Sequence, residues 1–353
     1  MAKKIKVFLG SYGNMTQAQC LNCRALAQYL DKSKFDVAIR TVYSGDLDCE
    51  PLKEARRFHV RYPAKIWAPL QVIRGILWAD IIYAPNPERW RWVRFAIKYL
   101  GKKAFKTIEG AFVGTNITKA VALEGSVEKV VESLTYTGNT YPITKAMIPV
   151  NKASIGLESK DTVLYLGVTT DGFKNEVPRT KLTDIAIVGS NLFYKGLDDF
   201  FEVARRFPQL SFHVIGSGMG KIDPTAEIER LGLKNCCAHG SLDHQKLAEL
   251  LKSIQLHIFP SRAEGFPKVT LETAAAGVPS IVYSDYGAEE WITTGKDGFV
   301  VKTVDEIAAV VEDLVAHPAK LQQLADNARE LAKSFDWSIR VKDWEREIEE
   351  ICK

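Results

Sequence analysis

Short apolar runs alternate along the chain with longer segments in which apolar residues recur every three or four positions. In the first half, runs of strand length occur at residues 5–9, 35–42, 81–84 and 104–108. In the second half, they occur at 184–188, 211–215, 255–259 and 280–283. Segments of helical period lie between them, as at 197–207 and 244–252. This alternation predicts an α/β fold, in which parallel sheets are covered by helices on both faces.

The length of the chain, 353 residues, predicts two such sheets, because one hydrophobic core seldom serves so many residues. Residues 151–161 are polar and lack periodicity, so we expect a linker there. The expected domains are Rossmann-like and cover residues 1–155 and 160–335. A last helical segment, residues 336–353, has no strand of its own and is expected to pack back on the first domain.

Composition narrows the class of protein. The chain is 46% hydrophobic and 25% charged with a net charge of +4, which is typical of a globular protein and is no nucleic-acid signature. Six cysteines lack the spacing of a zinc site, and we expect Cys20 and Cys23 to pack as small apolar side chains in a helix. The start, MAKKIKVFLG, resembles a first strand more than a signal peptide, and no apolar stretch is long enough to span a membrane. We therefore expect a cytoplasmic protein.

Two glutamates follow the run that ends at Phe259. Glu264 lies in a loop, and Glu272 lies in a helical segment that starts after Pro267, a residue suited to the first turn of a helix. Ligands bind at the carboxyl ends of parallel strands, and the N-terminus of a helix favours a diphosphate. The carboxylates can accept hydrogen bonds from sugar and ribose hydroxyls. Taken alone, such a pair is more often a solvated surface feature, so the surrounding elements decide the interpretation.

Those elements complete a pattern that resembles the E-x7-E motif of retaining GT-B glycosyltransferases, in particular glycosyltransferase family 4. A strand at 185–189 is followed by Lys195-Gly196-Leu197, and the HVIGSG turn at 213–218 comes next in the same order. The resemblance covers about residues 162–353 and is only architectural before them. It implies a GT-B fold, with two Rossmann-like domains facing a cleft, the acceptor on the first and the donor on the second.

The resemblance also implies roles for individual residues. Glu272 would contact the donor ribose, Glu264 the hydroxyls of the transferred sugar, and Lys195 the diphosphate. Many members carry an arginine after the glycine that ends the first strand, where this chain has Ser190. Arg262 and Lys268 are the candidates to replace that charge. The other predicted donor-binding residues are glycines of the strand ends and neighbours of the helix start: Gly189, Gly216, Gly218, Gly240, Leu242, Gly265, Phe266, Pro267 and Val269.

Candidate acceptor residues in the first domain rest on weaker signals. Gly10, Gly13 and Asn14 form the first strand-to-helix turn, where glycine lets a ligand approach the backbone, although a tight turn without a ligand explains them equally well. Glu109 ends another expected strand and is the third candidate catalytic residue; Glu124 is a weaker candidate.

A segment of the first domain mixes aromatic and basic residues. On a helix, Arg91, Arg94 and Lys98 form one stripe, with Trp90 and Trp92 at its edges, a pattern that suits an anionic membrane surface. The segment 65–78 adds further tryptophans and an arginine. An ordinary amphipathic helix packed on the sheet explains the pattern equally well. RNA fits less well because no RNA-binding motif accompanies the basic residues, and we expect no nucleic-acid partner.

Together these features predict a retaining glycosyltransferase. The expected donor is a UDP-sugar, with a GDP-sugar next, and the expected acceptor is a saccharide, lipid-linked, in surface polysaccharide or glycolipid synthesis at the inner face of the membrane. No metal or other cofactor is expected, because no D-x-D-like metal site is evident and the resemblance is to GT-B enzymes, which generally need no metal. A nucleotide-sugar epimerase of the same fold and a catalytically silent sugar-nucleotide-binding protein are the alternatives.

Overall fold

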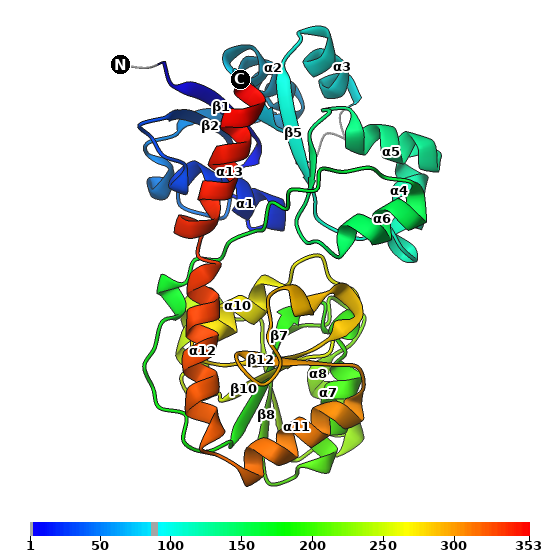
Figure 1. The fold of residues 1–353 in the computed structure, drawn as a ribbon, viewed down its shortest axis with the longest axis vertical. Helices are drawn as coiled ribbons and strands as arrows, with labels where there is room; N and C mark the ends of the chain where they lie inside the picture. Colours follow the sequence, from blue (N-terminus) through cyan, green and yellow to red (C-terminus); the bar gives the residue numbers. More distant parts are fainter. Residues whose placement is uncertain (1–2, 86–90) are drawn as a thin grey trace. The chain divides into compact units, whose positions relative to one another are not determined.

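The computed structural model describes residues 3–85 and 91–353 and divides the chain into two compact units (Figure 1). The first unit comprises Met1–Gly167 together with Trp337–Lys353, and the second comprises Val168–Asp336. Each unit contains a six-stranded parallel sheet. The fold is therefore the predicted pair of α/β units, and the last helix belongs to the first of them.

The sheet of the first unit has the strand order β3-β2-β1-β4-β5-β6. Its strands are β1 (Ile5–Tyr12), β2 (Phe35–Val42), β3 (Arg56–Val60), β4 (Ile81–Tyr83), β5 (Lys103–Ile108) and β6 (Thr140–Pro142). Its helices are α1 (Ala18–Tyr29), α2 (Ala64–Trp78), α3 (Arg91–Tyr99), α4 (Thr115–Glu124), α5 (Val127–Thr135), α6 (Met147–Ile155) and α13 (Trp337–Cys352). The expected linker is partly wrong, because residues 151–155 form the last turn of α6.

Two layers of helices cover the first sheet. The inner faces of α2 and α3 share one apolar cluster with the sheet, which includes Val72, Ile76, Val93 and Ile97. Helix α13 packs on the opposite face, where the fully buried Trp344 contacts the rings of Tyr83 and Phe105 at centroid distances of 5.4 and 6.2 Å. The Trp344 indole also donates a hydrogen bond to the Tyr165 carbonyl at 3.0 Å. Helix α13 is thus part of the core of the first unit, as predicted.

The second sheet has the strand order β12-β11-β10-β7-β8-β9. Its strands are β7 (Asp184–Ser190), β8 (Ser211–Ser217), β9 (Cys236–Gly240), β10 (Leu256–Phe259), β11 (Ser280–Tyr283) and β12 (Gly298–Val301). Its helices are α7 (Leu197–Arg206), α8 (Pro224–Leu231), α9 (His244–Leu251), α10 (Lys268–Ala275), α11 (Val304–Ala316) and α12 (Lys320–Ser334). Short 3-10 helices complete the chain: η1 (Glu50–Leu52), η2 (Asp171–Phe173), η3 (Leu192–Lys195), η4 (Ser284–Tyr286) and η5 (Ala288–Glu290).

The central strand β7 explains why the apolar runs of this unit are continuous. Ile185 and Ile187 belong to one apolar cluster, which includes residues of α7 and α11. Ala186 and Val188 belong to another, with residues of α9 and α10. Because successive side chains of a strand point to opposite faces, a strand covered on both faces must be apolar at every position. The continuous run therefore predicts a sheet with helices on both sides.

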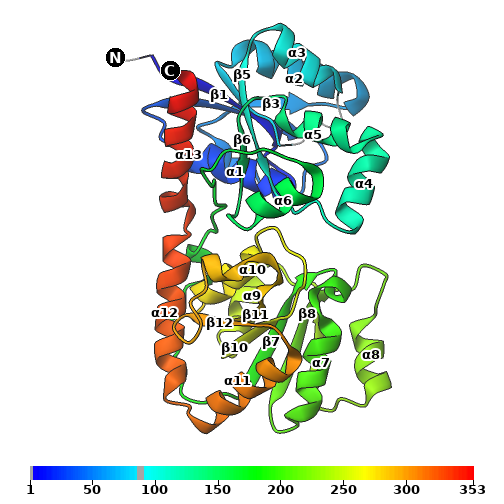
Figure 2. The same ribbon diagram turned by 45° about the vertical axis from the view of Figure 1, so that its right-hand side comes forward.

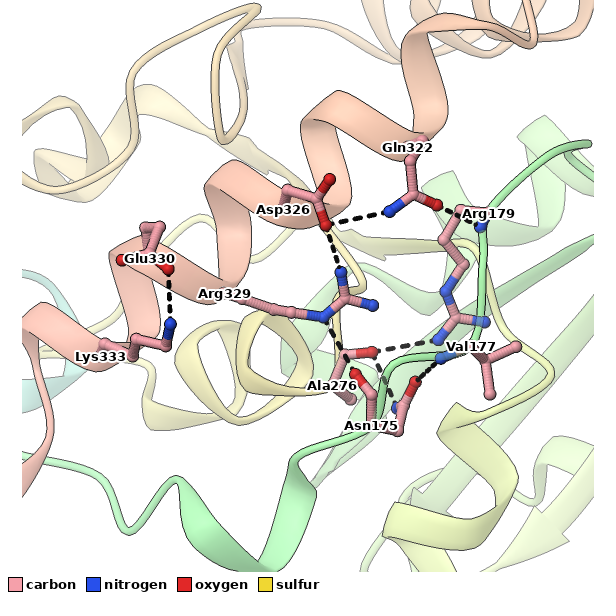
Figure 3. Close-up of polar contacts among 9 residues, drawn as sticks. All are labelled: Asn175, Val177, Arg179, Ala276, Gln322, Asp326, Arg329, Glu330 and Lys333. Atoms are coloured by element: carbon pink, nitrogen blue, oxygen red, sulfur yellow. Dashed lines mark hydrogen bonds and ion pairs between the residues drawn. The ribbon is translucent and has the colours of Figure 1, made fainter.

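A buried arginine joins the helices on one of these faces (Figure 3). The Arg179 guanidinium donates hydrogen bonds to the carbonyls of Lys252 at 2.6 Å, Leu251 at 2.9 Å and Ala276 at 3.0 Å. These carbonyls lie at the C-terminal ends of α9 and α10. The last carbonyls of a helix have no hydrogen-bond partner within that helix, so Arg179 supplies one. Burial lowers the pKa of Arg179 to about 10, so the group stays charged at neutral pH. Nearby, Arg329 of α12 donates to the Asn175 carbonyl at 3.0 Å.

Replacing Arg179 by methionine, Arg179→Met, should lower the free energy of unfolding by about 3 kcal/mol, because three buried carbonyls lose a charged donor. Arg205→Met is the matched control: Arg205 pairs with Glu202 on the surface, with 52% of its side chain exposed, and should change stability by less than about 0.5 kcal/mol. Denaturant unfolding followed by circular dichroism measures both. Equal effects of the two changes would contradict the assigned role of Arg179.

Candidate functional site

Two strand-end loops of the second unit meet at an ion pair between Lys195 and Glu264. Lys195 ends η3, which follows β7, and Glu264 lies in the loop after β10. The Lys195 ammonium contacts the Glu264 carboxylate, and the Ser261 hydroxyl donates a hydrogen bond to the same oxygen, Oε1, at 2.5 Å. The ammonium also lies 5.5 Å from the centroid of the Phe259 ring. The structure therefore brings together the two residues that the sequence pairs only by resemblance.

The glycine of the Lys-Gly-Leu sequence explains how the loops come so close. Gly196 has a φ of +76°, and a Cβ atom placed on it would lie 2.3 Å from the carbonyl oxygen of Pro260. Any side chain would push the two loops apart, since such a contact is far shorter than van der Waals distance. Gly196 thus holds Lys195 against the loop that carries Glu264.

Helix α10 begins directly after this loop and points its N-terminus toward the carboxyl edge of the sheet. Pro267 precedes the helix, and its carbonyl accepts hydrogen bonds from the Thr270 N–H at 3.1 Å and the Thr270 hydroxyl at 2.8 Å. The first N–H groups of a helix have no carbonyl partners within it and carry the positive end of its dipole. The loop and helix start therefore provide hydrogen-bond donors suited to an anion, beside a lysine.

Glu272 lies on the next turn of α10, where it is half-buried. Desolvation raises the pKa of its carboxyl, while electrostatic interactions with His244 and Lys268 act in the opposite direction. His244 begins α9, and its ring lies 5.5 Å from that of Phe173. The structure thus places Glu272, Lys268 and His244 in one electrostatic neighbourhood, although the sequence analysis did not select His244.

The glycines at the end of β8 have a structural explanation. Gly216 pairs with Gly189 of β7 in the sheet register and has a φ of +129°. A Cβ atom on Gly216 would lie 1.8 Å from the Gly189 carbonyl oxygen. The Gly218 carbonyl accepts the N–H of Lys221 at 3.0 Å and closes a turn. These contacts require glycine at position 216 whether or not a ligand binds, so its donor role stays a prediction.

Other predicted donor residues pack within the unit. Phe266 is buried against Trp291 and Phe335, with ring centroids 5.2 and 5.6 Å away. Leu242 and Val269 lie against the apolar cluster of α9 and α10. The remaining positions are more open: Ser190 is exposed at the end of β7, Gly240 is exposed at the end of β9 with a φ of +66°, and Gly265 is half-buried.

Arg262 is already engaged by carboxylates. Its guanidinium lies 3.3 Å from Asp199 and 3.8 Å from Asp285, and it stacks over the ring of Tyr283 at 4.6 Å. Tyr283 in turn donates a hydrogen bond to Asp199 at 2.8 Å. The candidate replacement for the missing arginine at Ser190 therefore has local partners that balance its charge, which weakens that prediction.

Lys221 is a nearby cation that the sequence analysis missed. Its ammonium contacts the Tyr194 hydroxyl and lies 4.0 Å from the centroid of the Tyr194 ring. Phe193 and Tyr194, directly before Lys195, each expose 53% of their surface, and Met219 exposes 65% with a φ of +50°. The adjacent aromatic pair in Asn-Leu-Phe-Tyr-Lys-Gly is the feature of the sequence that could have indicated this part of the site. Nothing in the apolar pattern places Lys221 beside it.

In the first unit, Glu109 lies at the end of β5 and receives three hydrogen bonds. The donors are Asn22 and Thr107, both at 3.3 Å, and Tyr83 at 3.5 Å. Burial, followed by the charge of Glu109, raises the pKa of Tyr83. Glu109 and Glu124 both line a cavity of about 310 Å³. The structure thus brings these two predicted acids to one cavity.

The turn between β1 and α1 is held by hydrogen bonds to the backbone of β2. The Asn14 side chain donates to the Val42 carbonyl at 2.8 Å and accepts the Val42 N–H at 3.0 Å. Gly13 donates its N–H to the Arg40 carbonyl at 2.7 Å. Gly10 lines a separate cavity of about 250 Å³, and its carbonyl accepts a hydrogen bond from Arg40 at 2.5 Å. Gly13 and Asn14 therefore have structural roles, and Gly10 borders this cavity.

The basic stripe predicted on α3 divides into two faces. Trp90 lies outside the described residues, while Arg91, Trp92 and Lys98 are exposed. Arg94 instead turns inward and pairs with Glu124 at 2.5 Å, with only 14% and 6% of the two side chains exposed. The prediction that Arg94 belongs to the exposed stripe is wrong, because Glu124 of α4 holds its charge.

Over residues 3–85 and 91–353, no group of three or more histidine, cysteine or acidic side chains is arranged to hold a metal ion. Cys20 and Cys23 are buried free thiols of α1, as expected from their packing.

None of the described helices combines the length and the apolar character that crossing a membrane requires.

Comparison with known proteins finds likenesses for the second unit. Residues 169–331 match the family described as Glycosyl transferases group 1. The chain is 31% identical over 170 residues to a glycogen synthase of Mycobacterium tuberculosis, covering 45% of this chain and 41% of that protein. It is also 31% identical over 186 residues to an MMP alpha-(1->4)-mannosyltransferase of Mycolicibacterium hassiacum, covering 50% and 44%. The matches thus span less than half the length of these relatives.

Solved structures resemble the whole chain. A sucrose-phosphate synthase from Thermosynechococcus elongatus aligns over 99% of both chains with a TM-score of 0.76 and 15% identity. The Anabaena protein HepE, solved in complex with UDP and glucose, aligns over 99% of both chains with a TM-score of 0.70 and 18% identity. The two six-stranded sheets and these likenesses define the class of fold, which is GT-B.

Replacing the strand-end glycine by alanine, Gly216→Ala, should lower the free energy of unfolding by at least about 2 kcal/mol, since its Cβ would collide with the β7 backbone. Gly232→Ala is the matched control, because Gly232 has a φ of +66° but open space around it. It should cost only about 1 kcal/mol for the left-handed backbone. Thermal unfolding compares them, and similar losses for both would contradict the close approach of β7 and β8.

The raised pKa of Glu272 predicts a pH-dependent stability. A folded-state pKa above the unfolded value means that ionisation opposes folding, so wild type loses stability relative to Glu272→Gln as pH rises through that pKa. The glutamine variant should therefore gain more at pH 8 than at pH 5, as measured by melting temperature. Glu312→Gln, at an exposed position of α11, serves as the control. A gain that is equal at both pH values would show that burial does not disfavour the Glu272 carboxylate.

Proposed function

We propose that this protein transfers a sugar from a nucleoside diphosphate donor to a saccharide acceptor, with retention of the anomeric configuration. The ion pair of Lys195 and Glu264 beside the start of α10 carries the proposal. It joins a cation for a diphosphate to a carboxylate for sugar hydroxyls. The family match of this unit and the UDP complexes of HepE support it. A UDP-sugar is the preferred donor and a GDP-sugar is the next choice.

Lys195 would bind the diphosphate. Cleavage of the bond between the sugar and the phosphate leaves negative charge on the departing diphosphate, and fixed positive groups stabilise that charge. Lys195 and the first N–H groups of α10 are such groups, and both are already in position before the bond breaks. Glu264 holds the lysine at the edge of the sheet until the more highly charged diphosphate competes for it.

Glu264 would orient the transferred sugar. Both its ion pair with Lys195 and its hydrogen bond from Ser261 use Oε1. Oε2 is then the oxygen available to accept hydrogen bonds from sugar hydroxyls. Glu272, one turn and more into the helix, would accept hydrogen bonds from the ribose. The two carboxylates thereby fix the donor on either side of its diphosphate.

In the retaining reaction that we propose, the bond between the anomeric carbon and the diphosphate oxygen breaks. The acceptor oxygen forms the new bond to that carbon on the same face, and its proton passes to the departing diphosphate oxygen. The protein's own cations balance the leaving charge, so we propose that no metal cofactor is required.

The acceptor would be bound by the first unit. Glu109, which accepts hydrogen bonds from Asn22 and Thr107 and lines a cavity, would accept a hydrogen bond from the acceptor hydroxyl. We propose a lipid-linked saccharide as the acceptor, in surface polysaccharide or glycolipid synthesis. The exposed Arg91, Trp92 and Lys98 of α3 support a cytoplasmic protein that associates peripherally with the inner face of the membrane.

The donor site is tested by single substitutions. Lys195→Ala should lower kcat about 100-fold or more, because an electrostatic donor to the leaving group is lost. Glu272→Gln should weaken UDP-sugar binding about 10-fold or more through the loss of charged hydrogen bonds. Lys252→Ala, which breaks a comparable lysine–glutamate pair on the surface, should change neither.

UDP release and thermal stabilisation by UDP-glucose or GDP-mannose measure these effects. A ligand at about 100 times its dissociation constant adds about 2.7 kcal/mol, which is large enough to read. Wild-type turnover and donor affinity in both site variants would reject this site. Formation of an epimerised donor in the absence of any acceptor would reject the transfer reaction itself.

A further inference from the structure

Helix α2 presents an unusual apolar stripe to solvent. Ile66, Leu70, Ile73 and Leu77 expose 68%, 42%, 42% and 58% of their surface. Their spacing of four, three and four residues places them on one face of the helix, over a length of about 16 Å at 1.5 Å per residue. Single exposed apolar residues are common, but a continuous row of four marks an interaction surface.

Helix α3 continues this surface. The two helices lie side by side in both views of the fold (Figures 1 and 2), and their inner residues share one apolar cluster on the same face of the sheet. Their outer faces therefore look away from the sheet on the same side. On α3 the outer face carries Phe95 and Tyr99, which are 69% and 78% exposed and whose rings stack at a centroid distance of 5.8 Å.

The charged side chains of α2 and α3 themselves all have one sign. Lys65 and Arg74 of α2 and Arg91 and Lys98 of α3 are exposed, and neither helix contains an acidic residue. A groove of about 460 Å³ adjoins α3, with Arg91, Lys98 and Lys129 of α5 in its lining. Two carboxylates also line the groove: Glu124, which pairs with Arg94, and the exposed Glu132. The outer faces of α2 and α3 therefore combine an apolar row with a basic rim and exposed aromatic rings.

We propose that α2 and α3 form a docking surface for an anionic lipid bilayer, into which the stripe of α2 inserts. The four apolar side chains enter the acyl boundary, the rings of Phe95 and Tyr99 lie at the headgroup level, and the exposed cations contact lipid phosphates. This proposal deepens the membrane association of the proposed function and moves its centre from the basic face of α3 to the apolar face of α2.

Charge favours a bilayer over a second copy of the chain. In a twofold dimer, each patch faces its own copy, so the basic rim would meet another basic rim. Like charges brought together in this way oppose association, whereas an anionic surface attracts every cation of the rim. The stripe is also no candidate for a spanning segment, since α2 has 15 residues and a span needs about 20.

The test uses the full chain and vesicles of phosphatidylcholine, alone or with about one third phosphatidylglycerol. Wild type should sediment with the anionic vesicles, and added salt should weaken binding. The double variant Leu70→Gln/Leu77→Gln keeps good helix formers and should lower the partition coefficient about tenfold or more. Ile339→Gln/Val315→Gln removes two exposed apolar side chains elsewhere and should bind like wild type.

Several results would overturn the proposal. They are binding of the Leu70→Gln/Leu77→Gln variant equal to wild type, failure of wild type to bind anionic vesicles, and a wild-type dimer that the variant converts to a monomer. Donor binding to the same variants, read as thermal stabilisation by UDP-glucose, separates this test from the proposed reaction. Vesicle binding without donor binding would support the surface and reject the reaction, and donor binding without vesicle binding would do the reverse.

Discussion

The contact between Gly196 and the Pro260 carbonyl is the constraint on which the candidate donor site depends. It allows the loop after β7 to lie directly against the loop after β10, and so places an ammonium beside a carboxylate at the edge of the sheet. The same approach puts Lys195 next to the start of α10. Strands that are neighbours in a parallel sheet end at the same edge, but their loops meet only if nothing intervenes. The absence of a side chain at Gly196 is thus as important for the site as the charges of Lys195 and Glu264.

Much of the fold could be predicted from the apolar pattern, because each parallel sheet is covered on both faces. In β7 every position from Ile185 to Val188 is buried, which makes the strand visible as a continuous run. Edge strands gave no such signal. β9 contains half-buried and exposed residues such as Cys237, and β3 exposes Arg56 and Arg57, so both were missed. Their positions follow from pairing with a neighbour rather than from their own composition.

The site was less predictable than the fold, since its residues meet through loops. Glu264, Glu272 and Lys195 could be selected because a known sequence pattern contains them. Lys221 could not, because it enters through a turn whose backbone includes Met219 in a left-handed conformation. Conversely, the sequence suggested that Asn14 belongs to a ligand-binding turn. In the structure, both the N–H₂ group and the oxygen of its side-chain amide are hydrogen-bonded to the backbone of Val42. Short motifs indicate which residues lie near a strand end, but not which of their side chains are already hydrogen-bonded to the backbone.

The place of Trp344 in the first unit has a consequence for how the chain is made. This side chain fills the core against Tyr83 and Phe105, and the Tyr83 hydroxyl contacts Glu109. The first unit is therefore assembled from segments separated by the whole of the second. On the ribosome, where chains emerge from the N-terminus, the first sheet lacks the packing of α13 while 169 further residues, Val168–Asp336, are synthesised. The unit translated first is thus completed last, and Glu109 acquires its final surroundings only after α13 is synthesised.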